Sequence, residues 1–256
     1  MSRARLAIVL LLAISAAASA QENATLAWTL PWDVDWVTAV TFVGNNRVVA
    51  GNNVGQIVAW DLPESPKDPA PKPSRRFDGH TNVITRLLPA PDGTTFYSSS
   101  YDHAIRVWNA MAPSEKKGTI VLNSRAIGEA ESRKRKAPKA IEVAVEIVES
   151  TKTFTGHHDW IVAMSLSKDG KTLASGDEKG EVIVADAGTG SEKKRWKVKG
   201  WVYGLGLSPD GTALTISERT PLIFDSGRHA GVKIWSATGE MKKDLGKAFD
   251  KAGMMS

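Results

Sequence analysis

The segment GHTNVITRLLPAPDG at residues 79–93 decides the fold, because it returns without a gap as GHHDWIVAMSLSKDG at residues 156–170. Fainter copies stand at residues 201–211 (WVYGLGLSPDG) and 36–46 (WVTAVTFVGNN). Self-similarity of this kind is the sequence signature of a repeat architecture. The alignment assigns one structural position to Trp36, Val83, Trp160 and Trp201.

Each copy is followed by two further segments in which apolar residues alternate with polar ones. They lie at residues 48–61, 96–109 and 173–186, and in the fourth copy at 214–217 and 231–236. Alternation bounded by Gly, Asn and Asp predicts short antiparallel strands joined by tight turns. We therefore expect an all-β chain of about four four-stranded antiparallel units, at residues 31–78, 79–155 with an inserted charged loop at 113–149, 156–198 and 199–245, and the start of a fifth unit at 253–256.

The second unit resembles the WD-repeat β-propeller family most clearly. It has Gly79-His80 at its start, Pro91-Asp92-Gly93 at its first turn, Asp102 at its second and Trp108-Asn109 at its end. The resemblance covers nearly all of the chain after residue 20 apart from the insertion. It implies a WD-repeat propeller or partial propeller of the secreted bacterial type.

The resemblance also implies a buried structural hydrogen-bond network. Its members here are His80, Ser98, Asp102 and Trp108. The chemistry is sound, since one imidazole nitrogen can donate to a carboxylate while the other accepts from a hydroxyl.

The other units depart from this pattern. The third keeps His157 and Ser175 but has Lys179 and Ala185 where Asp and Trp are expected. The first has Asp33, Ala50 and Val54 in place of His, Ser and Asp, and the fourth keeps Ser217 and Trp235 without a Gly-His pair. We therefore expect a complete network only in the second unit.

The first twenty residues have the three-part pattern of a secretory signal peptide. Arg3 and Arg5 precede an apolar run at residues 6–14, and small residues end at Ala20. The apolar run is far shorter than the ~20 residues that cross a bilayer. We expect cleavage before Gln21, a secreted or periplasmic chain and no membrane span after cleavage, an uncleaved anchor being the weaker alternative.

Composition excludes several classes of site. The chain has no cysteine, which rules out disulfides, thiolate metal sites and covalent haem attachment. A net charge of +5 is modest for a nucleic-acid binder. The basic run at residues 132–136 is balanced by nearby glutamates, and we expect a solvated loop there and no nucleic-acid partner.

Four units are at the low limit for a propeller, and an open arc leaves strand edges unpaired. Residues 26–30 are predicted to be an outer strand that could clasp a last blade. We expect a truncated or partial propeller, with two alternatives: self-association of two chains to complete one ring, and a stand-alone four-bladed form.

Few residues suggest a catalytic or metal-binding site. His157-His158-Asp159 invites a metal hypothesis, but adjacent residues in an extended strand point to opposite faces. Asp33 and Asp35 are a carboxylate pair expected to be solvated or to cap a turn. No catalytic residue, cofactor or metal site is expected.

The residues Trp36, Trp160 and Trp201 form the candidate interaction face, because family geometry would put them at the mouth of the central channel. The alternative is that they pack between blades. We expect a non-catalytic extracytoplasmic scaffold for a protein or peptide partner. The alternatives are a propeller enzyme, either a hydrolase or a quinone-dependent dehydrogenase, and an accessory part of a cytochrome-linked redox protein.

Overall fold

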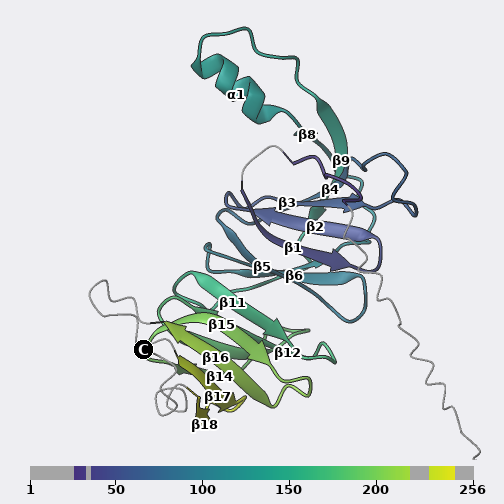
Figure 1. The fold of residues 1–256 in the computed structure, drawn as a ribbon. Coiled ribbons are helices and arrows are strands. Elements are labelled where there is room, and N and C mark those ends of the chain that lie inside the picture. Colours follow the sequence, from purple (N-terminus) through teal and green to yellow (C-terminus); the bar gives the residue numbers. More distant parts are fainter. Residues whose placement is uncertain (1–25, 33–35, 220–230, 246–256) are drawn as a thin grey trace, which may run out of the picture.

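The computed structural model describes residues 26–32, 36–219 and 231–245, whose strands form four stacked sheets (Figure 1). The signal peptide predicted at residues 1–20, the pair Asp33 and Asp35, and the start of a fifth unit at 253–256 lie outside the described residues. Among the described residues, no helix has the length and apolar character needed to cross a membrane.

The four sheets follow the chain order and confirm the predicted fold class. The second sheet contains β5 (Ile84–Pro89), β6 (Thr95–Ser100), β7 (Ile105–Asn109) and β10 (Lys152–Phe154). The third contains β11 (Ile161–Leu166), β12 (Thr172–Asp177), β13 (Glu181–Asp186) and β14 (Glu192–Lys197). The fourth contains β15 (Trp201–Leu207), β16 (Ala213–Arg219), β17 (Gly231–Ser236) and β18 (Met241–Asp244).

The first sheet has six strands instead of the four expected. In spatial order they are β1 (Val37–Val43), β2 (Arg47–Asn52), β3 (Ile57–Asp61), β4 (Pro73–Asp78), β9 (Glu142–Glu149) and β8 (Lys117–Val121). The two extra strands come from the insertion.

The sheets pack through their innermost strands, β1 on β5, β5 on β11 and β11 on β15. Glycine on the second strand of a sheet permits close approach of the next sheet at two places. A Cβ on Gly51 would lie 2.6 Å from the Ile84 side chain, and one on Gly176 would lie 2.3 Å from Val202. Because the packed faces are apolar, the core lies between successive sheets.

The first and fourth sheets end this stack, which we call the arc. No strand pair of the described residues packs these two sheets together as extensively as the neighbouring sheets pack. The outward face of the first sheet exposes Val40 and Phe42. On the fourth sheet Leu205 and Leu207 pack inward, so that Gly204 and Gly206 face outward.

The prediction of a strand at residues 26–30 is wrong. These residues pair with no strand and instead run across the first sheet. The indole of Trp28 donates to the Asp68 carbonyl over 2.9 Å. Leu30 and Trp32 pack on the apolar cluster that contains Trp60, so burial rather than sheet pairing holds the segment.

The insertion at residues 113–149, expected as a charged loop, is folded for most of its length, and the alternating residues at 141–150 correctly indicate a strand there. It folds as β8, helix α1 (Ser124–Ser132) and β9, and only the basic run at 132–136 matches the expected exposure. β9 pairs antiparallel with β8 and parallel with β4. The insertion therefore extends the first sheet, although it leaves the chain from the second.

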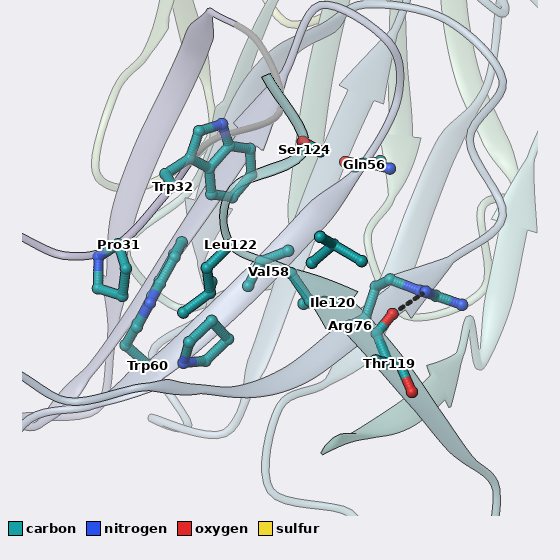
Figure 2. Close-up of a pocket in the computed structure, with 12 residues that line it drawn as sticks. Pro31, Trp32, Gln56, Val58, Trp60, Arg76, Thr119, Ile120, Leu122 and Ser124 are labelled. Atoms are coloured by element: carbon teal, nitrogen blue, oxygen red, sulfur yellow. Dashed lines mark hydrogen bonds between the residues drawn. The ribbon is translucent and has the colours of Figure 1, made fainter. Parts of the chain in front are cut away.

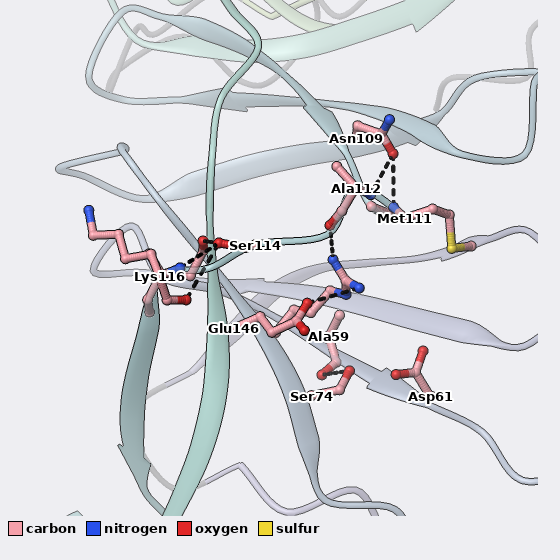
Figure 3. Close-up of polar contacts among 12 residues, drawn as sticks. Ala59, Asp61, Ser74, Asn109, Met111, Ala112, Ser114, Lys116 and Glu146 are labelled. Carbon is pink, nitrogen blue, oxygen red and sulfur yellow. Dashed lines mark hydrogen bonds and ion pairs between the residues drawn. The ribbon is translucent and has the colours of Figure 1, made fainter.

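Polar contacts fix this hairpin where it leaves the second sheet (Figure 3). Arg75 donates to the Ala112 carbonyl and forms an ion pair with Glu146 at 3.0 Å. The Ser114 hydroxyl donates to the Ile147 carbonyl. These contacts join β4, the chain after β7, and β9.

Candidate functional site

Each innermost strand carries a β-bulge near its start. The pairing of β1 with β2 skips one residue, and the same skip recurs in β5, β11 and β15. The extra residues are Thr38, Thr85, Val162 and Tyr203. Bulges re-aim side chains and are frequent beside functional sites.

The backbone places the aligned tryptophan position just before each bulge. The carbonyl of Trp36 accepts from the Asn53 amide, and that of Trp160 accepts from the Glu178 amide. The Val83 carbonyl accepts from Tyr101 in the same way, and Trp201 pairs with Arg219. The sequence alignment of this position therefore matches the structure.

Two bulged threonines join neighbouring sheets. The Thr38 hydroxyl donates to the Ile84 carbonyl, and the Thr85 hydroxyl donates to the Ile161 carbonyl, each over 2.6 Å. A buried carbonyl is thereby satisfied from the adjacent sheet. The bulges thus help to hold the arc together.

All four bulged residues line one cavity of about 340 Å³ on the concave side of the arc. Trp201 and Tyr101 add aromatic surface, while Arg86 and Glu178 add charge. Burial, together with the charges of Asp159 and Asp177, raises the pKa of Glu178. A mainly apolar cavity with a few charged groups is suited to binding.

The three predicted interaction tryptophans have different environments. Trp201 lines the cavity, and Trp36 is 79% exposed. Trp160 is 42% exposed but also stacks on Tyr101, with ring centroids 4.5 Å apart. Trp160 therefore packs between two sheets, as the alternative expected, while part of its side chain remains exposed.

The second sheet holds the four predicted network residues in one chain of hydrogen bonds. The Trp108 indole donates to the Ser98 hydroxyl over 2.8 Å, and this hydroxyl lies 2.7 Å from Nε2 of His80. Nδ1 of His80 lies 2.7 Å from Asp102. Because the ionised Asp102 carboxylate can only accept, Nδ1 of a neutral His80 donates to it and Nε2 accepts from the Ser98 hydroxyl.

Asp102 is an ionised acceptor in this chain. Burial opposes its ionisation, but hydrogen bonds from His80 and from the Thr81 and Ala104 amides outweigh burial and lower the pKa of Asp102. His80, Ser98 and Trp108 are buried in the interior of the sheet.

The third sheet also has a histidine–carboxylate contact, although the alignment placed Lys179 at the acidic position. In the third sheet, Nδ1 of His157 lies 3.0 Å from Asp177, and Nε2 lies 2.8 Å from Ser175. The carboxylate comes from the last residue of β12, two positions before Lys179. This network lacks only the tryptophan, which Ala185 replaces.

The expectation that His157 and His158 point apart is wrong. Both residues lie in the connection between β10 and β11, where strand alternation does not apply. Their Nδ1 atoms lie 3.8 Å and 3.6 Å from the same oxygen, Oε2 of Glu181. Asp159 instead pairs with Lys179.

Three sheets place a tryptophan at the same register, but only Trp108 reaches a serine. Trp60 and Trp235 are opposite Val48 and Leu214, as Trp108 is opposite Phe96. Their indole nitrogens are buried without an acceptor among the described residues. In the first sheet Ala50 occupies the position that Ser98 has in the second. In the fourth sheet Ser217 pairs with the outward-facing Gly204, so Ile216 occupies that position.

A second cavity, of about 220 Å³, lies on the outward side of the first sheet (Figure 2). Trp32 and Trp60 line it with ring centroids 5.4 Å apart, and Arg76 donates to the Thr119 carbonyl at its edge. Three distant segments build this cavity: the residues before β1, the first sheet and the insertion. No local sequence pattern signals such a site.

Residues 71–109 and 148–186 match the family model described as "WD domain, G-beta repeat". The Small ribosomal subunit protein RACK1 of Caenorhabditis elegans is 30% identical over 95 residues, which are 35% of this chain and 29% of that protein. The Cross-pathway control WD-repeat protein 2 of Flammulina velutipes is 29% identical over 76 residues, which are 29% of this chain and 24% of that protein.

The RACK1 protein of Neurospora crassa is 27% identical over 89 residues, which are 34% of this chain and 28% of that protein. The chain thus spans less than a third of the length of each of these relatives. The two family matches end with β7 and β13, and the insertion lies between them. The matches support WD40 repeats at these two segments of the chain.

Proposed function

We propose, on the premise that the chain carries WD40 repeats, that it is a non-catalytic extracytoplasmic scaffold that binds a protein or peptide at the concave cavity. The observation that carries the proposal is the convergence of four bulged residues and Trp201 on this cavity. Exposed aromatic groups at its edge, such as Tyr203, are typical anchors of protein interfaces. The signal-peptide pattern supports secretion or export to the periplasm.

The shape of the cavity favours an extended segment over a globular surface. It is lined by one bulge from each of four successive sheets, so that it runs across the arc instead of lying on one sheet. Arg86 and Glu178 offer one charge of each sign to a peptide backbone or its side chains. We therefore propose a short peptide segment as the bound element.

The arc also supports a partial propeller as the larger assembly. Its outward apolar residues Val40 and Phe42 occupy the face that packs on a neighbouring blade elsewhere in the arc. A ring completed by further repeats or by a second copy would cover them. Light scattering tests this: a stable, non-aggregating monomer of the purified chain would contradict it.

A displayed random-peptide library tests the binding site. Peptides selected on the wild-type chain should bind the Tyr203→Ala variant at least about tenfold more weakly, because one aromatic anchor of an interface contributes about 1.4 kcal/mol or more. Tyr203 is 60% exposed, so this change spares the core. Met241→Ala is the matched control, because Met241 is exposed on β18 and does not line the cavity.

Each outcome of this experiment leads to a different conclusion. Equal binding by wild type and Tyr203→Ala would place the contact elsewhere and refute the cavity as the site. Equal loss in Met241→Ala would show a general surface effect and also count against it. Failure to enrich any peptide over several rounds would contradict the proposed function itself.

A further inference from the structure

We propose a binding site for one Zn²⁺ ion on the third sheet, formed by His157, His158, Asp177 and Glu181. Oε2 of Glu181 is the common point, since Nδ1 of His158 lies 3.6 Å from it and Nδ1 of His157 lies 3.8 Å from it. Nδ1 of His157 is in turn 3.0 Å from Oδ2 of Asp177. The donor atoms of His157, Asp177 and Glu181 all lie within 4.8 Å of one another.

These separations suit a tetrahedral ion. With bonds of about 2.0–2.2 Å from zinc to nitrogen or oxygen, the ligand atoms of a tetrahedral site lie about 3.3 Å apart. The donor atoms of His157, Asp177 and Glu181 already lie near this spacing, whereas the exposed His158 side chain lies 3.6 Å from Glu181 and would have to turn toward the ion to complete the tetrahedron. Two imidazoles with two carboxylates are a donor set that suits zinc.

The carboxylate of Glu181 is prepared for a cation. Its Oε1 atom pairs with Arg195 at 2.8 Å, whereas Oε2 is buried with no hydrogen bond among the described residues. A buried anionic oxygen without a partner is costly, and a bound cation would satisfy it. Arg195 thus orients Glu181 and leaves one oxygen directed at the two histidines.

The positive charge of Arg195 does not dominate the site. The same guanidinium pairs with Glu192 at 2.6 Å, which balances its charge. Glu181 and Asp177 then contribute two negative charges against the two positive charges of the ion. An ion reaches the site from solvent through His158, which is 83% exposed.

The serine beside His157 can accept the imidazole proton when Nδ1 binds an ion. A hydroxyl has two acceptor positions, and in the second sheet the Trp108 indole occupies one of those of Ser98. In the third sheet Ala185 replaces that tryptophan, so no indole competes with Nε2 of His157 for Ser175. The His157 proton can therefore move from Nδ1 to Nε2, with no net proton released, and Nδ1 becomes a ligand.

The second sheet is an internal control for the site. It repeats the third sheet 77 residues earlier, and the positions of His158 and Glu181 are occupied there by Thr81 and Ala104. The histidine–carboxylate–serine contacts are common to both sheets, but the two additional donors occur only in the third. The WD-repeat pattern accounts for the histidine–carboxylate–serine contacts but not for the added donors His158 and Glu181.

The test uses the full chain without a histidine tag, stripped of metal with a chelator. Titration with Zn²⁺ followed by calorimetry should give one ion per chain, and Co²⁺ should give the visible absorption bands of a tetrahedral complex. His158→Ala should weaken Zn²⁺ binding at least about tenfold. Glu181→Gln should weaken it at least as much, because it removes the shared negative ligand while it keeps an oxygen for Arg195.

His103→Asn is the matched control, because His103 is an exposed histidine outside the cluster and Asn tolerates its φ of 67°. It should bind Zn²⁺ as the wild type does. Circular dichroism of each variant separates loss of a ligand from loss of the fold, and His158→Ala alters only a surface side chain. Binding that survives both His158→Ala and Glu181→Gln, or no stoichiometric binding by the wild type, would overturn the proposal.

Discussion

Tyr101 and Trp160 lie face to face across the boundary between the second and third sheets, with their ring planes 10° apart. Tyr101 follows β6, and Trp160 immediately precedes β11. The stack therefore joins two sheets at the edge of the concave cavity. Loss of the stack would therefore affect both the stability of the arc and the geometry of the cavity mouth.

Trp160→Ala should lower the free energy of unfolding by about 1–3 kcal/mol, since it removes a stacked pair and part of its buried area. Urea denaturation measures this change. A double-mutant cycle with Tyr101→Ala should show a coupling of about 0.5–1.5 kcal/mol. Trp36→Ala, at a far more exposed position, should change stability by less than about 0.5 kcal/mol, and simple additivity of the two stack variants would contradict the coupling.

Ser98→Ala should cost more stability than Ser175→Ala. In the second sheet the change leaves both Nε2 of His80 and the Trp108 indole without a partner, whereas in the third it affects only His157. At about 1–3 kcal/mol for each stranded buried group, the expected losses are about 2–5 and about 1–3 kcal/mol. Thermal and urea denaturation of both variants provide the comparison, and equal losses would contradict the directed chain from Trp108 to Asp102.

Asp102 should make stability fall in acid. Its folded pKa is lower than its ordinary value of 3.8, so its contribution is fully present above that value and is lost as the pH falls through it towards the folded pKa. Asp102→Asn should therefore flatten the decline in unfolding free energy between about pH 5 and about pH 2. Asp68→Asn, at an exposed loop position, is the control, and an unchanged slope in Asp102→Asn would refute this assignment.

Ile147→Ala tests whether the insertion belongs to the first sheet. Ile147 is 2% exposed on β9 and packs over Gly118 of β8. Truncation of such a side chain costs about 2–5 kcal/mol. Urea denaturation should show this loss together with faster hydrogen exchange in β4, while a loss confined to the hairpin with β4 unaffected would show that the insertion is an independent appendage.

The repeated segments made most of the strands predictable. A Gly-His start, an alternating strand and a turn ending in Gly93 or Gly170 specify local geometry, and both glycines have the positive φ that such turns need. The position of the Trp–Ser contact in the second unit followed from the family resemblance. These features depend on residues close together in the sequence.

The insertion could not be predicted in the same way. Its alternating residues at 142–149 indicate a strand, but they do not say which strand will pair with it. The partner is β4 of the preceding unit, in parallel. That choice depends on contacts such as Arg75 with Glu146, which join residues distant in the sequence.

Asp177 was missed because the alignment assigned the acidic position to Lys179. The structure shows that the carboxylate can come from the end of β12, where Asp177 also accepts from the Lys179 and Glu181 amides through its other oxygen. One residue therefore caps the turn and holds the histidine. A search for a carboxylate anywhere in the second turn, instead of at one aligned position, would have found it.

The bulge repeated in every innermost strand divides that strand into two parts with different freedom to change. Before and at the bulge, the aligned positions hold Trp, Val, Trp and Trp, and then Thr, Thr, Val and Tyr. After it, residues such as Leu87 and Met164 are buried and apolar. The units can therefore diversify the lining of the shared cavity while the strands after the bulge still pack on their neighbours, so that a change in the lining does not have to come at the expense of foldability.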